Sequence, residues 1–116
     1  MKIRSILVGA AAAGLVLAAG SPALADGTVS IPGASVQFKS GGEQFIVCDT
    51  RADARAAIAV YRLGPDGETF LENHNGAGTC KTFNVSITEG RAVYYSACLR
   101  QGHNITPCSA ERRDYA

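Results

Sequence analysis

Residues 34–48 read ASVQFKSGGEQFIVC, two apolar-rich segments on either side of Ser40-Gly41-Gly42. Apolar and polar side chains alternate over residues 34–39, and this period of two predicts a strand with one buried face. Residues 43–48 contain the continuous apolar run Phe45-Ile46-Val47, which predicts a strand covered on both faces. Because glycine adopts backbone conformations that other residues avoid, the two glycines predict a turn between these strands.

Similar short segments make up the rest of the chain after residue 26, and most of them are bounded by Gly, Pro, Asp or Asn. We expect strands within residues 28–31, 56–63, 69–71, 82–87 and 91–99. The alanines of residues 56–63 also permit a short helix, but Ile58, Val60 and Tyr61 favour a strand. Residues 101–107 are expected to form a polar loop, and the charged end from Ser109 is expected to be irregular.

This succession of six or seven short strands, without a long helical pattern, predicts an all-β fold. The expected architecture is a small disulfide-stapled β-sandwich of the immunoglobulin-like kind, or a partly open barrel. It should form a single domain over residues 26–116, since no repeat or linker interrupts them. The aromatic residues expected in the core or in cross-strand pairs are Phe38, Phe45, Tyr61, Phe70, Phe83 and Tyr94.

The first 25 residues have the three parts of a secretory signal peptide. Lys2 and Arg4 precede an apolar run of 14 residues, Ile6 to Ala19, and Ala23-Leu24-Ala25 matches a small-x-small cleavage site. The run is too short to span a membrane, and no cysteine near the cleavage site could carry a lipid anchor. We therefore predict a secreted, extracellular protein, cleaved after Ala25 on the general secretory route because no twin arginine precedes the run.

Removal of this leader from the 116 residues leaves 91, enough for one small domain and too few for a large cofactor enzyme. The leader holds two of the 11 basic residues and none of the 10 acidic ones, so the remaining chain carries a net charge of −1. This balance argues against a nucleic-acid binder and against a disordered acidic tail. The arginines expected on solvated faces are Arg51, Arg55, Arg62, Arg91, Arg100, Arg112 and Arg113.

Four cysteines, Cys48, Cys80, Cys98 and Cys108, lie in the predicted mature chain. An even number in an oxidising compartment indicates two disulfides, and the spacing matches no common zinc site. Three pairings are possible. We favour Cys48–Cys80 with Cys98–Cys108, because the second pair closes a short, turn-rich segment. In the loop-entropy model these bridges would stabilise the fold by about 3.7 and about 2.8 kcal/mol.

No catalytic residue is predicted. His74 and His103 both lie in polar, Gly-containing loops, where a solvated histidine is the ordinary case. Ser96, His103 and Asp49 supply the residue types of a catalytic triad, but no Gly-x-Ser-x-Gly motif selects a nucleophile. A glycosidase would need two carboxylates across a cleft, and Glu43, Glu68, Glu72 and Glu89 all lie in or beside turns.

Asp49 and Asp53 flank a loop that resembles a fragment of a calcium site. Calcium prefers six to eight oxygen ligands, and the EF-hand pattern is absent. The alternative is that these aspartates bond to nearby backbone and end the strand. We predict no metal and no cofactor, and leave calcium at these two residues open. Asn84-Val85-Ser86 and Asn104-Ile105-Thr106 match the glycosylation triplet, which is frequent by chance.

Residues 45–53 (FIVCDTRAD), 75–81 (NGAGTCK) and 98–102 (CLRQG), with the Ala-Leu-Ala leader end and Cys108, resemble small secreted proteins of actinobacteria such as streptomycetes. The likeness spans nearly the whole mature chain. It rests on turns and cysteines, so it implies a fold and a compartment rather than an activity.

Two better understood families of such organisms share this architecture. Tendamistat-like α-amylase inhibitors are all-β with two disulfides, but their inhibitory Trp-Arg-Tyr turn is missing because the chain has no Trp. Neocarzinostatin-like apoproteins share the sandwich and the four cysteines, but they pair cysteines at short range, unlike Cys48 and Cys80. Neither amylase inhibition nor chromophore carriage is therefore carried over.

The sequence favours a non-catalytic extracellular binding or interaction module, because a stapled sandwich presents its loops at little entropic cost. The expected contact loops are Asp49–Arg55, Pro65–Glu68, Asn73–Gly78 and Gln101–Thr106. The partner would be an extracellular protein or a cell-surface glycan. The alternatives are a toxin-like or antimicrobial protein and a small secreted hydrolase.

Overall fold

A computed structural model describes residues 27–65 and 67–116. The predicted signal peptide, residues 1–25, lies outside the described residues and stays a prediction. No helix in the described part of the chain is long and apolar enough to cross a membrane.

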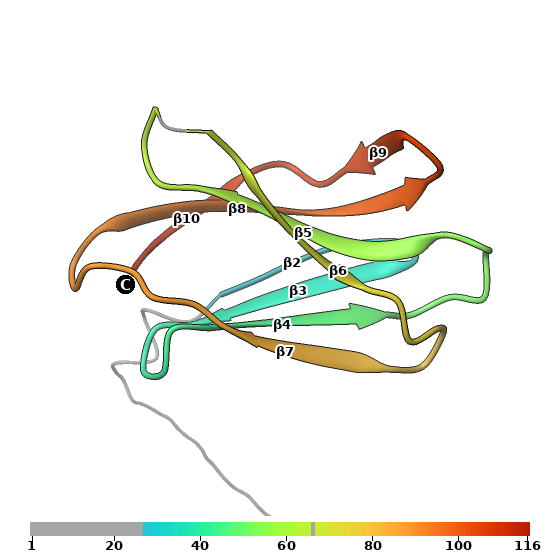
Figure 1. The fold of residues 1–116 in the computed structure, drawn as a ribbon, viewed down its shortest axis with the longest axis horizontal. Helices are drawn as coiled ribbons and strands as arrows, with labels where there is room; N and C mark the ends of the chain where they lie inside the picture. Colours follow the sequence, from blue (N-terminus) through green and yellow to red (C-terminus); the bar gives the residue numbers. More distant parts are fainter. Residues whose placement is uncertain (1–26, 66) are drawn as a thin grey trace, which may run out of the picture.

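Two antiparallel sheets pack face to face (Figure 1), which confirms the predicted all-β sandwich. The four-stranded sheet has the order β2 (Gly27–Ile31), β3 (Ala34–Lys39), β4 (Gln44–Asp49) and β7 (Cys80–Asn84). The five-stranded sheet has the order β10 (Arg112–Tyr115), β8 (Ala92–Gln101), β5 (Ala56–Arg62) and β6 (Thr69–Asn73), and β9 (Asn104–Cys108) also pairs with β8. The described residues form no helix.

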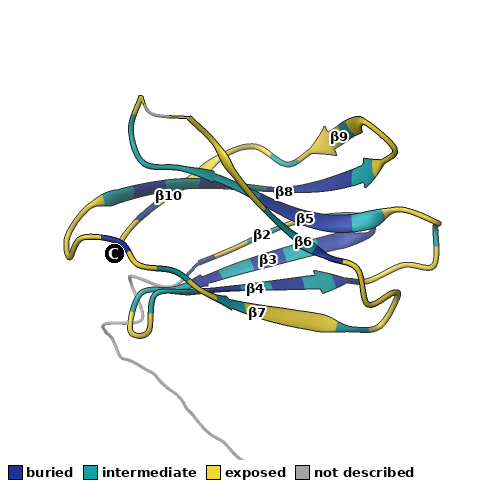
Figure 2. Ribbon diagram, viewed as in Figure 1, coloured by how far each residue is buried: buried dark blue, intermediate teal, exposed yellow. Residues whose placement is uncertain are grey.

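The β3–β4 hairpin supplies much of the interior. Its register places Val36 opposite Val47 and Phe38 opposite Phe45, and all four side chains are fully buried (Figure 2). The predicted alternation over residues 34–39 is confirmed. The prediction that residues 43–48 are covered on both faces is wrong, because the burial of β4 alternates and Ile46 lies half-buried on the outer face.

Aromatic rings fill the space between the sheets. The Phe38 ring lies 4.9 Å from Phe45 and 5.8 Å from the fully buried Tyr95, centroid to centroid. Tyr94, rather than Tyr95, was the expected aromatic residue of this strand, and it lies on the outer face beneath the Arg62 guanidinium. Phe70 also lies on the outer face, paired with Val60 and 51% exposed.

The C-terminal segment differs from expectation. The predicted polar loop at residues 101–107 is instead the turn into β9 and most of that strand, and the predicted irregular end contains β10. Both strands pair with β8. Its ten residues are long enough for β10 to pair with the first half and β9 with the second half. The expected strand at residues 82–87 ends at Asn84. The described residues therefore form nine strands, where six or seven were expected.

Both disulfides have the favoured pairing, which confirms that prediction. Cys48–Cys80 bridges β4 and β7, and Cys98–Cys108 bridges β8 and β9. Each pair joins residues directly opposite one another in the same sheet, on the outer face. Antibody domains instead tie their two sheets together with the bridge, so the immunoglobulin likeness does not extend to the disulfides. Two disulfides fit an extracellular protein.

Removing the two bridges separately tests their loop-entropy contributions. We expect Cys48→Ser/Cys80→Ser to lower the free energy of unfolding by about 3.7 kcal/mol and Cys98→Ser/Cys108→Ser by about 2.8 kcal/mol, because the first bridge closes the longer loop. Urea unfolding of both variants beside the wild type measures the difference. A larger loss from the Cys98–Cys108 pair would contradict this order.

A buried polar cluster holds the C-terminal strand. Asp114 is 6% exposed and accepts hydrogen bonds from the Tyr95 hydroxyl and from Arg112 Nε, the latter at 3.0 Å. A side chain at Gly27 of β2 would overlap Arg112 and Asp114, so the cluster packs directly on the other sheet. Burial, together with the bond to Asp114, raises the pKa of Tyr95 well above its usual value.

This raised pKa predicts a loss of stability in alkali. Tyr95 stays neutral in the folded state while the unfolded tyrosine ionises near pH 10, so the contribution is complete below about pH 10 and declines above it. The expected slope from this residue is about 1.4 kcal/mol per pH unit. Tyr95→Phe should remove that slope, at a cost of about 1–3 kcal/mol at pH 7 because Asp114 loses a donor. Urea unfolding between pH 7 and pH 11 checks both effects, and an unchanged slope would contradict them.

Candidate functional site

Four connections gather at one end of the sandwich, on the right in Figure 1. They are the turn at residues 32–33 and the segments 50–55, 74–79 and 102–103. Three of the four expected contact loops lie here, because β4, β6 and β8 all end at this edge and β5 begins there. The fourth, of which residues 65, 67 and 68 are described, lies between β5 and β6 at the opposite end (Figure 1).

Between residues 50–55 and the start of 74–79 lies a cavity of about 430 Å³. We call it the loop-end cavity. Its polar lining comes from Asp49, Arg51, Asp53, Arg55, Asn73 and His74. The apolar part of the lining comes from Ala52, Ala54, Ala56 and Ala77.

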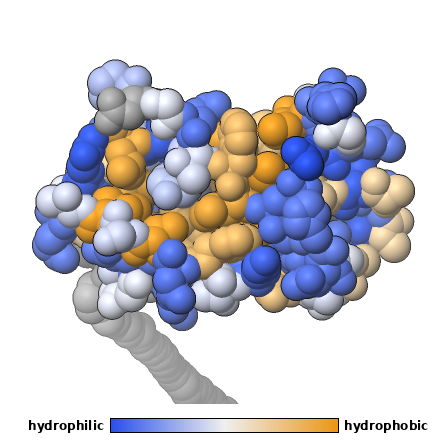
Figure 3. All heavy atoms as spheres, in the orientation of Figure 1, coloured by the Kyte–Doolittle hydropathy of each residue, from blue (hydrophilic) through white to orange (hydrophobic). Residues whose placement is uncertain are grey.

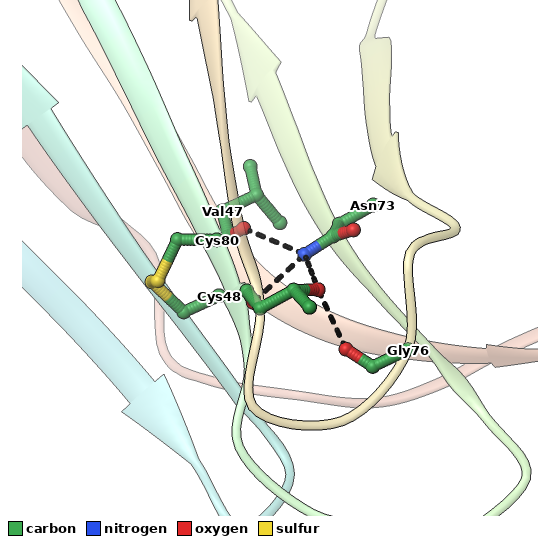
Figure 4. Close-up of a disulfide and its surroundings, with 6 residues drawn as sticks. Val47, Cys48, Asn73, Gly76 and Cys80 are labelled. Atoms are coloured by element: carbon green, nitrogen blue, oxygen red, sulfur yellow. Dashed lines mark hydrogen bonds between the residues drawn. A yellow bond between two sulfur atoms is a disulfide. The ribbon is translucent and has the colours of Figure 1, made fainter.

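Asn73, the last residue of β6, supports one wall of this cavity and is fully buried. Its side-chain nitrogen donates to the Val47 carbonyl at 3.1 Å and to the Thr79 carbonyl at 3.0 Å (Figure 4). Its side-chain oxygen accepts from the backbone of Asn75 at 2.8 Å. One amide therefore links the five-stranded sheet to β4 and to segment 74–79. From the sequence, Asn73 was expected only as the first residue of a contact loop.

Segment 74–79 is also tied to the end of β4 through its backbone. Gly78 donates to the Asp49 carbonyl at 2.7 Å, and Asp49 donates to the Thr79 carbonyl at 2.9 Å. The Thr79 hydroxyl closes the turn by donating to the Gly76 carbonyl at 2.6 Å. Gly76 and Gly78 have positive φ, which glycine adopts without strain. Because these bonds hold the segment on two sides, this wall is ordered before any partner arrives.

Asp49 and Asp53 form the side-chain-to-backbone bonds expected of them. The Asp49 carboxylate accepts from Arg51 N at 3.2 Å, and the Asp53 carboxylate accepts from Arg55 N at 3.1 Å. Asp53 lies over Gly33, where a Cβ would come within 2.8 Å of its oxygen. Among the described residues no group of three or more His, Cys, Asp or Glu side chains could hold a metal ion.

Three charged side chains around the loop-end cavity, those of Asp49, Arg51 and Arg55, form no ion pair with a described residue. Asp49 is only 5% exposed, and its one hydrogen-bond donor within the described chain is a neutral backbone N–H. Arg51 and Arg55 are exposed, and neither guanidinium forms an ion pair with a described residue. Arg62 and Arg100, in contrast, bind Glu111 and Glu72. The cavity thus has a buried anionic group and unpaired cations at its rim.

His74 lies on the cavity rim with 67% of its side chain exposed. Its Nδ1 is 3.5 Å from Glu72, which binds Arg100 more closely, at 3.1 Å. The structure does not bring together Ser96, His103 and Asp49, the three residues considered for a catalytic triad. Asp49 lines the loop-end cavity, Ser96 lines a different groove, and His103 lies in the exposed turn between β8 and β9.

The four glutamates considered for a glycosidase are spread over the molecule. Glu43 accepts a bond from the backbone of Ile87 at 3.0 Å, and Glu89 lies in an exposed turn. Glu72 lies beside Arg100, and Glu68 lines a separate hollow on the outer face of the five-stranded sheet. No two of them line the same cavity among the described residues.

A second hollow, of about 280 Å³, lies on the outer face of the five-stranded sheet. Val60, Phe70, Ile105 and the Cys98–Cys108 bridge line it, with Ser96 and Glu68 as its polar residues. No local signal in the sequence marks this hollow, because it forms where the Val60–Phe70 pair lies near β9, and residues 101–107 were expected to be a loop.

Comparisons with protein-family models, curated proteins and solved structures found no match for this chain. The arrangement of residues at the loop end is therefore the basis for any statement about function.

Substitution of Asn73 tests whether its amide supports the loop end. Asn73→Ala leaves buried carbonyls of Val47 and Thr79 without this donor, so we expect unfolding free energy to fall by about 2 kcal/mol or more. His74→Ala, at the next position, should change it by less than about 0.5 kcal/mol because that side chain is largely exposed. Urea unfolding measures both variants, and equal effects would contradict the assignment.

Proposed function

We propose that this protein is a non-catalytic extracellular binding module that contacts its partner through the loop end. The observation that carries the proposal is the loop-end cavity, where buried Asp49 and unpaired Arg51 and Arg55 surround one space. Charges left uncompensated in the free protein favour a partner that compensates them.

The order of the surrounding loops supports binding. Asn73 and the backbone bonds of Asp49 hold segment 74–79, and Thr50 donates to the Gly33 carbonyl at 3.1 Å. A surface that is ordered in advance loses little conformational entropy when it binds.

The proposed compartment is outside the cell. The signal peptide predicted at residues 1–25 would direct secretion, and two disulfides suit an oxidising environment. The proposed partner is an extracellular protein or a cell-surface glycan.

Capture of a partner by the oxidised protein tests this proposal. Immobilised wild type is exposed to culture supernatants and cell envelopes, and mass spectrometry identifies what is retained. Arg51→Ala/Arg55→Ala should reduce retention of the partner by roughly tenfold or more, because charged contacts at a binding site often dominate its energy. Reduced protein should retain nothing specific.

Arg113→Ala is the matched control, since Arg113 is an exposed arginine on β10 at the opposite end. It should retain the partner as well as the wild type does. Retention that survives Arg51→Ala/Arg55→Ala, or that Arg113→Ala abolishes, would place the contact surface elsewhere.

A further inference from the structure

We propose that the loop-end cavity binds a zwitterionic group, with a protonated amine at Asp49 and a carboxylate at Arg51 and Arg55. This inference rests on the proposed function and names the chemistry that the site recognises. The shared chemistry is that of an amino acid or a short peptide, either free or exposed on a larger partner.

Asp49 would accept hydrogen bonds from a cationic donor. The residue lines the cavity and is 5% exposed, and among the described residues only the N–H of Arg51 donates to its carboxylate. A carboxylate has acceptor sites for about four hydrogen bonds, so this one donor leaves acceptor capacity for a ligand. A protonated amine in the cavity would supply both the opposite charge and further donors. A neutral group there would supply no opposite charge, and an anionic group would be repelled.

Arg51 and Arg55 would bind an anionic acceptor. Their backbone N–H groups are used by Asp49 and Asp53, which fixes the path of segment 50–55 and leaves both side chains at the rim. Neither guanidinium forms an ion pair in the described structure. Guanidinium groups bind carboxylates with two parallel hydrogen bonds, which makes them selective for this group.

The remaining lining suits a small aliphatic ligand. Ala52, Ala54 and Ala56 alternate along the chain with charged residues, Ala77 lies on the other segment, and a volume of about 430 Å³ accommodates a small molecule. Hydrophilic residues dominate the right-hand part of the face in Figure 3, where the loops lie in Figure 1. The apolar band of that face lies across its middle instead. A polar ligand with a short aliphatic part therefore fits the loop end better than an extended apolar one.

Titration with alanine, dialanine and trialanine tests the inference directly. Each is added to the oxidised, ¹⁵N-labelled protein, and NMR shifts are followed. We expect saturable shifts from residues 49–56 and 73–77 with at least one of them. The N-acetylated form, which lacks the cation, and the C-amidated form, which lacks the anion, should each bind roughly 10- to 100-fold more weakly. Equal binding of either blocked form, or no binding at millimolar concentration, would overturn the proposal.

Variants assign each charge to its residue. Asp49→Asn keeps the acceptor for Arg51 N but loses the charge, and it should remove the difference between the free and N-acetylated ligand. Arg51→Gln/Arg55→Gln should remove the difference between the carboxylate and the amide. Arg113→Gln should change neither. Circular dichroism and urea unfolding confirm that each variant is folded, and a folded Asp49→Asn that still discriminates the amine would overturn the proposal.

The outcomes separate this inference from the proposed function. A partner captured through Arg51 and Arg55, with no zwitterion bound, overturns the ligand class and leaves the binding module standing. A zwitterion bound with no macromolecule retained supports the ligand class in its free form and overturns the macromolecular partner. Retention that dialanine displaces supports a partner with an exposed peptide terminus.

Discussion

The side-chain amide of Asn73 joins the two sheets at the end where the loops gather. Because this side chain is fully buried, its donor and acceptor must both be satisfied by the protein. It satisfies them with the carbonyls of Val47 and Thr79 and the backbone of Asn75. These bonds set where segment 74–79 lies relative to β4. The position of that segment in turn determines one wall of the loop-end cavity.

The covalent bridges and the interior have separate roles. Both disulfides join neighbouring strands on outer faces, so neither ties one sheet to the other. The sheets are held by packing of Phe38, Phe45 and Tyr95 and, at the loop end, by the hydrogen bond from Asn73 to Val47. Buried Asp114, near the other end, bonds to Tyr95 and Arg112 within the five-stranded sheet. This division leaves the loop end shaped by hydrogen bonds, which are directional, rather than by apolar contacts, which are not.

Local patterns predicted a substantial part of the fold and less of the site. The alternation over residues 34–39 and the cysteine spacing led to the correct strand, the sandwich and the disulfide pairing. The turn chemistry of Asp49 and Asp53 was also predictable, because an aspartate bonds to backbone two residues away. Tyr94 was expected in the core or a cross-strand pair in place of Tyr95, although the alternating residues Val93, Tyr95, Ala97 and Leu99 mark the inward face of β8. Asn73 resembled its polar loop neighbours, and nothing local marked it as buried.

The sequence by itself determined the strand-forming segments, the turns between them and the cysteines available for bridges, because these depend on side chains close together along the chain. Tertiary structure decided the rest. β9 and β10 exist because β8 is long enough to pair with both, although their own residues are polar and charged. The loop-end cavity exists because residues 49–56 and residues 73–77, which strands β5 and β6 separate along the chain, meet there. Asp49 is buried because those segments cover it in the folded protein, and no local sequence pattern contains that information.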